Sequence, residues 1–319
     1  MRAPALAALA LSLATSAPAQ EACPAGQRPF AHAGGEACIP EDPQRIVTLQ
    51  DQNGLLPLLE LGVTPVGSAG HILEDGTQVF RRTEGYDTSS VTFVGTYGEP
   101  DREAVAALAP DLIIASPWPE GQAEAYSAIA PTIVFDPFSQ PLDEALLQLA
   151  DAVGASEEAL RLQAETVAQA EGLRAEFGDR LDRATLSFIS PDLAGGLFYP
   201  ENGTQAPGVA FRLLGLTRVP AQAALGSDDA PELSWEALPE HAGDLLFTFT
   251  YDGEDQGGEF DAFLALPVVQ ALSVAQAGQV VEIDGTETVG SAWGKVRVLM
   301  DRVAEEVRGD GLNLDLVAE

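Results

Sequence analysis

The chain of 319 residues carries 49 acidic and 16 basic side chains, and its formal net charge at pH 7 is −33. So acidic a surface repels nucleic acid and anionic membranes, which excludes both as expected partners. The length is sufficient for two compact domains, each with its own core. We interpret the acidity as a feature of solubility or of a salty habitat rather than of ligand binding.

The first 19 residues have the pattern of a secretory signal peptide. Arg2 supplies positive charge, residues 5–14 form a short apolar core, and Ala17-Pro18-Ala19 places small residues at a cleavage site. The apolar run is too short for a membrane span. The residues before Cys23, Gln20-Glu21-Ala22, lack the apolar and small pattern that precedes a lipidated cysteine. We therefore expect export through a cleaved signal peptide, without a lipid anchor.

Cys23 and Cys38 are the two cysteines of the chain, and both lie in a leader, residues 20–42, that is rich in glycine and proline. An oxidising compartment favours a disulfide between them, which would stabilise such a loop by roughly 3 kcal/mol in the chain-entropy model. Two free thiols are one alternative. A metal pair is another, although His32 is the only other soft ligand nearby.

Residues 43–141 alternate short strands with helices, which indicates a mainly parallel sheet covered on both faces. The segment 71–90 shows no element of its own, and a loop of that length in a compact domain is commonly functional. It holds Arg81 and Arg82, and Trp118 directly follows a predicted strand. The predicted strands are 44–49, 63–68, 91–94, 112–115 and 132–135, with helices at 55–61 and after Pro100-Asp101.

A linking segment of helices, residues 142–180, contains the longest predicted helix, Ser156–Phe177. Gly154 and Gly178 bracket it, and Ser156 suits an N-cap. At 1.5 Å per residue it extends roughly 33 Å, about the width of a small domain. We interpret it as a strut between two similar lobes, and an ordinary amphipathic helix inside one α/β domain is the alternative. Its apolar face is predicted as Leu160, Ala164, Val167, Ala170, Leu173 and Phe177.

Residues 181–319 resume the alternation of strands and helices. Tyr199 lies in a predicted turn after the strand 184–189, and Tyr251 follows another apolar strand. In open parallel sheets, ligands lie beyond the carboxyl ends of the strands. Trp118, Tyr199 and Tyr251 are therefore predicted to converge on one cleft between lobes. For each aromatic residue alone, packing in a core is an equal alternative. The other predicted elements are helices at 208–214, 260–272 (broken at Pro267) and 292–307, and a strand at 279–283.

Several segments follow one another in a characteristic order, namely PQRIVTL, LLELGVTPVGS, VGTYGEPDREAVAALAPDLIIAS, IAPTIVF, LSWEALPEHAGDLLF and LALPVVQALSVAQAGQVVEID. In this order they resemble the periplasmic ferric-siderophore binding proteins, which are similar to the vitamin B12 binding protein. The resemblance covers about Pro43 to Val307. It implies an α/β fold of two lobes, each with a mainly parallel sheet, joined by one long interlobe helix (the helical-backbone metal-receptor type).

The resemblance also implies a function. Such a protein is the periplasmic substrate-binding component of an ABC importer, which captures a ferric siderophore and delivers it to the membrane permease, as a monomer and without a cofactor. The family places one docking glutamate at the start of a helix on each lobe. PDREAV puts Glu103 and LSWEAL puts Glu236 at these positions. Because a helix start favours negative charge, an acid without a docking role is the alternative.

Ligand contacts are expected from basic and aromatic side chains, since guanidinium groups suit oxygen-rich chelates and rings stack on organic arms. Many relatives hold a base in the turn before the first docking helix, where this chain has Thr96-Tyr97-Gly98. With few bases, a hydroxamate, carboxylate or mixed siderophore is easier to accommodate than a tris-catecholate. The expected ligand contacts are Arg81, Arg82, Tyr97, Trp118, Tyr199, Tyr251 and Trp293.

Three other functions are weighed against this one. A heme or cobalamin binder of the same architecture is the alternative, with His71 as a candidate axial ligand. A direct metal site is not expected, because His32, His71 and His241 lie in dissimilar contexts. An exported α/β enzyme is disfavoured, because the chain has no G-x-S-x-G elbow, phosphate-cradling glycine loop or H-E-x-x-H helix.

Overall fold

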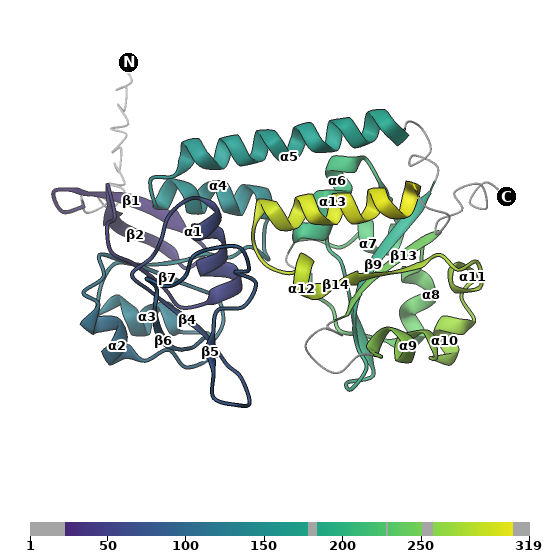
Figure 1. Cartoon of the computed structure of the whole chain (residues 1–319), viewed down its shortest axis with the longest axis horizontal. Coiled ribbons are helices and arrows are strands. Elements are labelled where there is room, and N and C mark those ends of the chain that lie inside the picture. Colours follow the sequence, from purple (N-terminus) through teal and green to yellow (C-terminus); the bar gives the residue numbers. More distant parts are fainter. Residues whose placement is uncertain (1–22, 178–183, 228, 251–257, 309–319) are drawn as a thin grey trace, which may run out of the picture.

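A helix of 22 residues, α5 (Ser156–Phe177), runs along one side of two α/β lobes, as Figure 1 shows. Its bounds are those predicted from the sequence. The structure, a computed structural model, describes residues 23–177, 184–227, 229–250 and 258–308. The predicted signal peptide, residues 1–19, and the predicted ligand contact Tyr251 lie outside the described residues.

The N-terminal lobe is built on a six-stranded sheet with the order β5-β4-β3-β7-β8 and with β6 paired to β4. All pairings are parallel except that of β5 with β4. The strands β3 and β7 are buried along their whole length, as expected where helices cover both faces of a parallel sheet. The elements are β3 (Ile46–Thr48), η1 (Asp51–Leu55), α1 (Leu56–Glu60), β4 (Gly67–Ile72), β5 (Gln78–Val79), β6 (Thr92–Thr96), α2 (Arg102–Ala107), β7 (Leu112–Ala115), α3 (Gln122–Ser127) and β8 (Thr132–Val134).

The prediction of a long loop at residues 71–90 is wrong for the first part of that segment. Strand β4 continues to Ile72 and pairs with β5, with His71 opposite Val79, so the chain forms a hairpin there. The two strands approach closely at Gly70, where an added Cβ would lie 2.4 Å from the carbonyl oxygen of Val79. The sequence Gly67-Ser68-Ala69-Gly70 has little strand propensity, which is why the pattern placed this strand too early.

The C-terminal lobe has a second six-stranded sheet with the order β12-β10-β9-β13-β14 and with β11 paired to β9. Strands β9, β11, β13 and β14 are parallel, whereas β10 pairs antiparallel with both β9 and the edge strand β12. Tyr199 therefore lies in a strand rather than in the predicted turn. The elements are β9 (Thr185–Asp192), β10 (Leu197–Pro200), α6 (Ala206–Leu214), β11 (Thr217–Arg218), α7 (Pro220–Ala223), β12 (Leu233–Ser234), η3 (Trp235–Ala237), α8 (Leu238–His241), β13 (Leu245–Thr250), α9 (Glu259–Leu264), α10 (Pro267–Gln270), α11 (Ser273–Gln276), β14 (Val280–Asp284), α12 (Gly285–Thr288) and α13 (Trp293–Arg308).

The leader is an antiparallel hairpin of β1 (Gln27–His32) and β2 (Gly35–Pro40). Cys23 and Cys38 form a disulfide with their Cα atoms 5.5 Å apart, which confirms the predicted pairing. The buried side chains Phe30 and Ile39 belong to the main apolar core. The leader is thus part of the N-terminal lobe rather than a separate arm.

One apolar cluster connects both lobes through α4 (Leu142–Ala152), α5, α6 and α13. The predicted apolar face of α5 is wrong in its first half, because Leu160 is 56% exposed. The stripe that the structure buries has small residues in that half, and small side chains let neighbouring helices pack closely without a strong apolar pattern. Its members are Ala159, Leu162, Thr166, Ala170, Leu173 and Phe177. Among the described helices, none is long and apolar enough to cross a bilayer.

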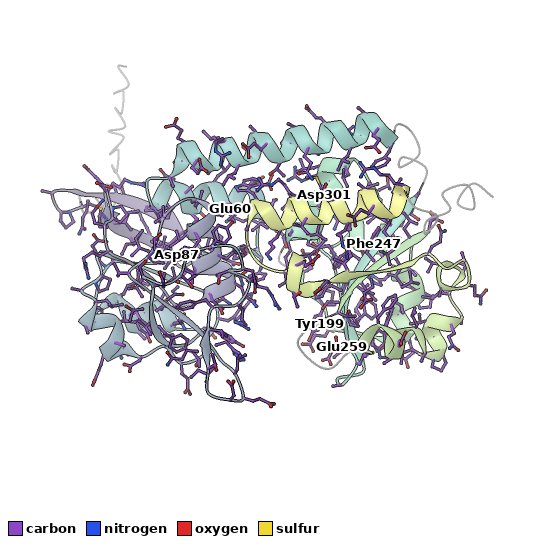
Figure 2. All side chains as sticks on the ribbon, in the orientation of Figure 1. Glu60, Asp87, Tyr199, Phe247, Glu259 and Asp301 are labelled. Atoms are coloured by element: carbon purple, nitrogen blue, oxygen red, sulfur yellow. A yellow bond between two sulfur atoms is a disulfide. The ribbon has the colours of Figure 1, made fainter. Side chains whose placement is uncertain are left out.

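Glu60 makes a second connection between the lobes, beside the start of α13 (Figure 2). Its carboxylate accepts hydrogen bonds from the backbone N–H groups of Trp293 at 2.6 Å and of Gly294 at 2.5 Å. These N–H groups have no partner within the helix, and the helix dipole favours a negative charge there. Burial raises the pKa of Glu60, and the two N–H groups together with Arg297 offset part of that rise.

Replacement Glu60→Gln tests this connection. An amide has one acceptor oxygen and would turn its NH₂ group toward one of the two helix N–H groups, leaving that buried donor unsatisfied. We expect the free energy of unfolding to fall by about 1–3 kcal/mol in urea denaturation. The control is Glu171→Gln, at an exposed acid of α5. A loss in the Glu60 variant no larger than in this control would contradict the capping role.

Candidate functional site

Residues that follow the strands of both sheets meet in a hollow of about 140 Å³ between the lobes. Its walls come from η1 and the segment after β8 in the N-terminal lobe, and from the end of β13, the end of α12 with the residues that follow it, and the start of α6 in the C-terminal lobe. Ligand sites of open parallel sheets lie at this edge, so the hollow is the candidate site. The lining residues are Gln52, Asn53, Pro137, Phe138, Leu142, Gln205, Ala206, Pro207, Phe249, Thr288, Val289, Gly290 and Ser291.

Direct contacts between the lobes hold the lining of the hollow in place. The backbone N–H of Ser291 donates to the carbonyl oxygen of Gln52 at 3.1 Å, and its hydroxyl donates to Oδ1 of Asn53 at 2.7 Å. Gly290 has φ of 124°, and an added Cβ would lie 2.7 Å from Cδ2 of Leu56. Only glycine allows this close approach. Gly290 and Ser291 therefore bound the hollow, and the chain continues from them to the start of α13, where Trp293 and Gly294 bind Glu60.

Arg81 lies next to the hollow but is already paired. Its Nε and Nη2 donate to Oδ2 and Oδ1 of Asp51 at 3.0 and 2.8 Å, and Asp51 is fully buried. Asp51 opens η1, whose next two residues line the hollow. The Arg81 guanidinium also lies 4.9 Å from the ring centroid of Tyr97, an exposed residue after β6. Arg81 thus holds an aromatic residue beside the hollow, with its charge balanced by Asp51.

Arg82 and Trp293 do not provide the predicted exposed contacts. Arg82 is 4% exposed and has a left-handed backbone with φ of 63°, so its side chain leaves the surface that Arg81 occupies. It lies close enough to Lys295 to lower the pKa of that amine, whose largest lowering comes from burial. Trp293 is 1% exposed and belongs to the apolar core that α13 shares with α5. Each side chain is buried within the protein, and a ligand-binding role for these two residues stays a prediction.

Trp118 and Tyr199 are exposed on the two lobes. Trp118 is 60% exposed, follows β7, and has its ring centroid 5.2 Å from that of Phe138, which lines the hollow. Tyr199 lies on the side of the C-terminal lobe that faces the N-terminal lobe (Figure 2). Its hydroxyl donates to Oε1 of Glu232 at 3.2 Å. Partial desolvation, with the negative charges of Glu232 and Asp192, raises the pKa of Tyr199.

Glu103 and Glu236 are both exposed in first helical turns. The Asp101 carboxylate caps α2 by accepting from the N–H groups of Glu103 and Ala104 at 2.8 and 3.1 Å. The Ser234 hydroxyl holds the pKa of Glu236 below its ordinary value. Because another side chain caps α2, the Glu103 carboxylate is not needed for that purpose. The docking role of both residues stays a prediction.

Several residues of the site were missed in the sequence. Gln52 and Asn53 lie between the predicted strand 44–49 and the predicted helix 55–61, where no element was predicted, and the structure forms the short π-helix η1 there. Phe138 offered a signal, since it follows a predicted strand as Trp118 does. Ser291 offered none, because its place depends on the packing of α13 against the other lobe. Within the described ranges, no three His, Cys, Asp or Glu side chains group as metal ligands.

Substitution of two tryptophans tests the exposure of Trp118 and the burial of Trp293. Trp118→Phe should remove most of the fluorescence quenching that acrylamide produces, because Trp118 is the most exposed of the three tryptophans. Trp293→Phe should keep that quenching and lower the free energy of unfolding by about 0.5–3 kcal/mol, as core substitutions do. Quenching of the Trp118 variant at the wild-type level would show that this side chain is shielded.

Comparisons with known proteins agree with this geometry. The probable siderophore-binding lipoprotein YfiY of Bacillus subtilis is 28% identical over 225 residues, which cover 68% of this chain and 66% of YfiY, so the match spans about two thirds of that relative. The Fe(3+)-citrate-binding protein YfmC of the same organism is 28% identical over 257 residues, 78% of this chain and 76% of YfmC.

The crystal structure of Staphylococcus aureus SirA complexed with staphyloferrin B has the same fold, with a TM-score of 0.73 at 20% identity, over 89% of this chain and 100% of that one. This likeness confirms the predicted α/β fold of two lobes. The family model described as periplasmic binding protein matches residues 54–286, more than half of the chain. With the strands of both sheets ending at a shared hollow, this chain belongs to the periplasmic binding protein family.

Proposed function

We propose that this protein is the substrate-binding component of an ABC importer, that it captures a ferric siderophore between its lobes, and that it delivers the complex to a membrane permease. The observation that carries the proposal is the hollow between the carboxyl ends of the two sheets, in a chain of this family. Two relatives support the ligand class, since YfiY is described as siderophore-binding and YfmC as Fe(3+)-citrate-binding.

The proposed capture uses shape and aromatic contact rather than catalysis. Ligand pockets commonly measure about 300–1,000 Å³, so a hollow of about 140 Å³ takes part of a chelate as the base of a wider site. Tyr97, Trp118 and Tyr199 are exposed on the surrounding walls and would contact the organic arms by stacking. The amides of Gln52 and Asn53 supply hydrogen-bonding groups at the base. In this proposal residues 43–141 and 181–319 form the two lobes, and residues 142–180 link them.

The proposed location is the periplasm, after cleavage of the signal peptide at residues 1–19. YfiY is described as a lipoprotein. In this chain the sulfur of Cys23 is bonded to that of Cys38, so it is not available for a lipid. The protein is proposed to act as a monomer without an anchor, with the permease as its partner at the membrane.

Binding titrations test the ligand class. Purified protein is titrated with ferrioxamine B, ferric citrate, heme and cobalamin while tryptophan fluorescence is followed. We expect saturable quenching by at least one ferric siderophore, because Trp118 is exposed beside the hollow. Saturable binding of heme or cobalamin alone would replace the proposal by the alternative ligand of the same architecture.

Charge reversal tests the docking residues. The double variant Glu103→Arg and Glu236→Arg should reduce siderophore uptake by cells at least about 10-fold, since each loss of a charged contact at an interface costs about 2–5 kcal/mol. Its affinity for the chelate should stay at the wild-type value, because both residues are exposed at helix starts rather than in the hollow. The control reverses Glu157 and Glu171 on α5, which lies on the side of the N-terminal lobe opposite α2 (Figure 1). A matching loss of chelate affinity in the double variant would contradict docking.

A further inference from the structure

The lining of the hollow carries no ionisable side chain among the described residues. Its polar members are the amides of Gln52, Asn53 and Gln205 and the hydroxyls of Thr288 and Ser291. The remaining lining residues are apolar or glycine. Amides and hydroxyls can hydrogen-bond an oxygen ligand, but they cannot neutralise a net charge. A highly charged anion would therefore lose its hydration in this hollow without gaining an opposite charge.

The N-terminal wall beside the hollow is close to neutral. Arg81 is paired there with the buried Asp51, whose carboxylate accepts hydrogen bonds from Nε and Nη2 along one edge of the guanidinium at 3.0 and 2.8 Å. The opposite charges of this pair largely cancel at the distance of a ligand. The Arg81 guanidinium also faces the ring of Tyr97. The arginine that was expected to meet an anionic chelate is thus committed to Asp51.

The C-terminal wall carries acidic groups. Glu232 is exposed and accepts a hydrogen bond from the Tyr199 hydroxyl at 3.2 Å. Desolvation, followed by the negative charges of Glu232 and Asp192, raises the pKa of Tyr199, so two carboxylates lie near this ring. The chain as a whole has a formal charge of −33, so its long-range field also opposes the approach of anions.

Lys295 is the nearest amine to the hollow, since its Cε lies 3.7 Å from the Cβ that Gly290 would carry. Its Nζ donates to the carbonyl oxygen of Glu287 at 2.9 Å, and Glu84, Glu287 and Glu60 all favour its charged form. Arg82 is a nearby base, and its positive charge, after the larger effect of burial, lowers the pKa of Lys295. This lysine therefore has three carboxylates near it, which offset its positive charge.

From these charges we infer that the site selects ferric siderophore complexes of neutral or positive net charge, the trihydroxamate class, over anionic tris-catecholates and citrates. Three singly deprotonated hydroxamates neutralise iron(III), whereas three doubly deprotonated catecholates leave a large negative charge. A pendant ammonium on a hydroxamate ligand would also find the faces of Tyr97, Trp118 and Tyr199 and the carboxylate of Glu232. This inference rests on the proposed function and names its substrate class.

Calorimetric titrations of the wild-type protein compare ferrioxamine B, ferric enterobactin and ferric citrate. We expect ferrioxamine B to bind at least about 10-fold more tightly than either anionic complex, because each unmatched charge near a protein surface is worth at least that factor. Higher ionic strength should narrow the difference, since salt screens repulsion between exposed charges. Equal or tighter binding of ferric enterobactin would overturn the inference while leaving the proposed function in place.

A positive charge introduced into the hollow tests whether the preference for neutral complexes can be reversed. Gln205→Arg adds a guanidinium at an exposed lining position, and it should strengthen ferric enterobactin binding and weaken ferrioxamine B binding, each by about 10-fold. Glu232→Gln keeps a hydrogen-bonding partner for Tyr199 and should shift the ratio in the same direction by a smaller factor. The matched control is Gln276→Arg at an exposed position of α11 in the outer part of the C-terminal lobe (Figure 1).

The variants separate the two levels of the hypothesis. If Gln205→Arg and Gln276→Arg change the affinities equally, the hollow does not select by charge and the inference is wrong. If none of the three ferric complexes binds the wild-type protein, the charge inference and the proposed function both fail. Preserved urea-denaturation midpoints in all variants ensure that a lost affinity reports on the site rather than on unfolding.

Discussion

The shared apolar core along α5 is the constraint on which the two-lobed structure depends. Its buried stripe, from Ala159 to Phe177, packs within one cluster that contains side chains of both sheets. A continuous helix has no glycine hinge that absorbs large changes in dihedral angle, so we expect only small motions between the lobes. The Glu60 carboxylate adds a second connection at the start of α13. The continuous chain of α5, its apolar core and the Glu60 hydrogen bonds together hold the carboxyl ends of the two sheets close to each other.

The packing between the two lobes explains how the lining residues of the hollow come together. The segment after β8 brings Phe138 from one lobe, and the end of β13 brings Phe249 from the other, to one place. Gly290 allows α13 to approach η1, and Ser291 then bonds to Asn53 across the boundary. Preorganised walls of this kind lower the entropic cost of ordering a bound ligand. The site is thus a product of packing between lobes, and each lobe alone supplies half of it.

Charge is distributed in a way that composition alone does not reveal. The chain is strongly acidic, yet the lining of the hollow is uncharged among its described residues. Asp51 is fully buried and binds Arg81 through both of its carboxylate oxygens, which is how a buried carboxylate avoids the cost of an unpaired charge. The same pair orients Tyr97. An arginine near a ligand site can therefore act as a support for an aromatic ring.

Elements whose signals are local could be predicted from the sequence. The bounds of α5, the alternation of strands and helices, the disulfide of Cys23 with Cys38 and the helix starts at Glu103 and Glu236 all follow from spacing, capping or compartment. The tertiary structure decided which side chains face the hollow. The packing buried Arg82 and Trp293, exposed Leu160, and placed Tyr199 in strand β10. These outcomes depend on close approach between segments far apart in the chain, which periodicity within one segment does not encode.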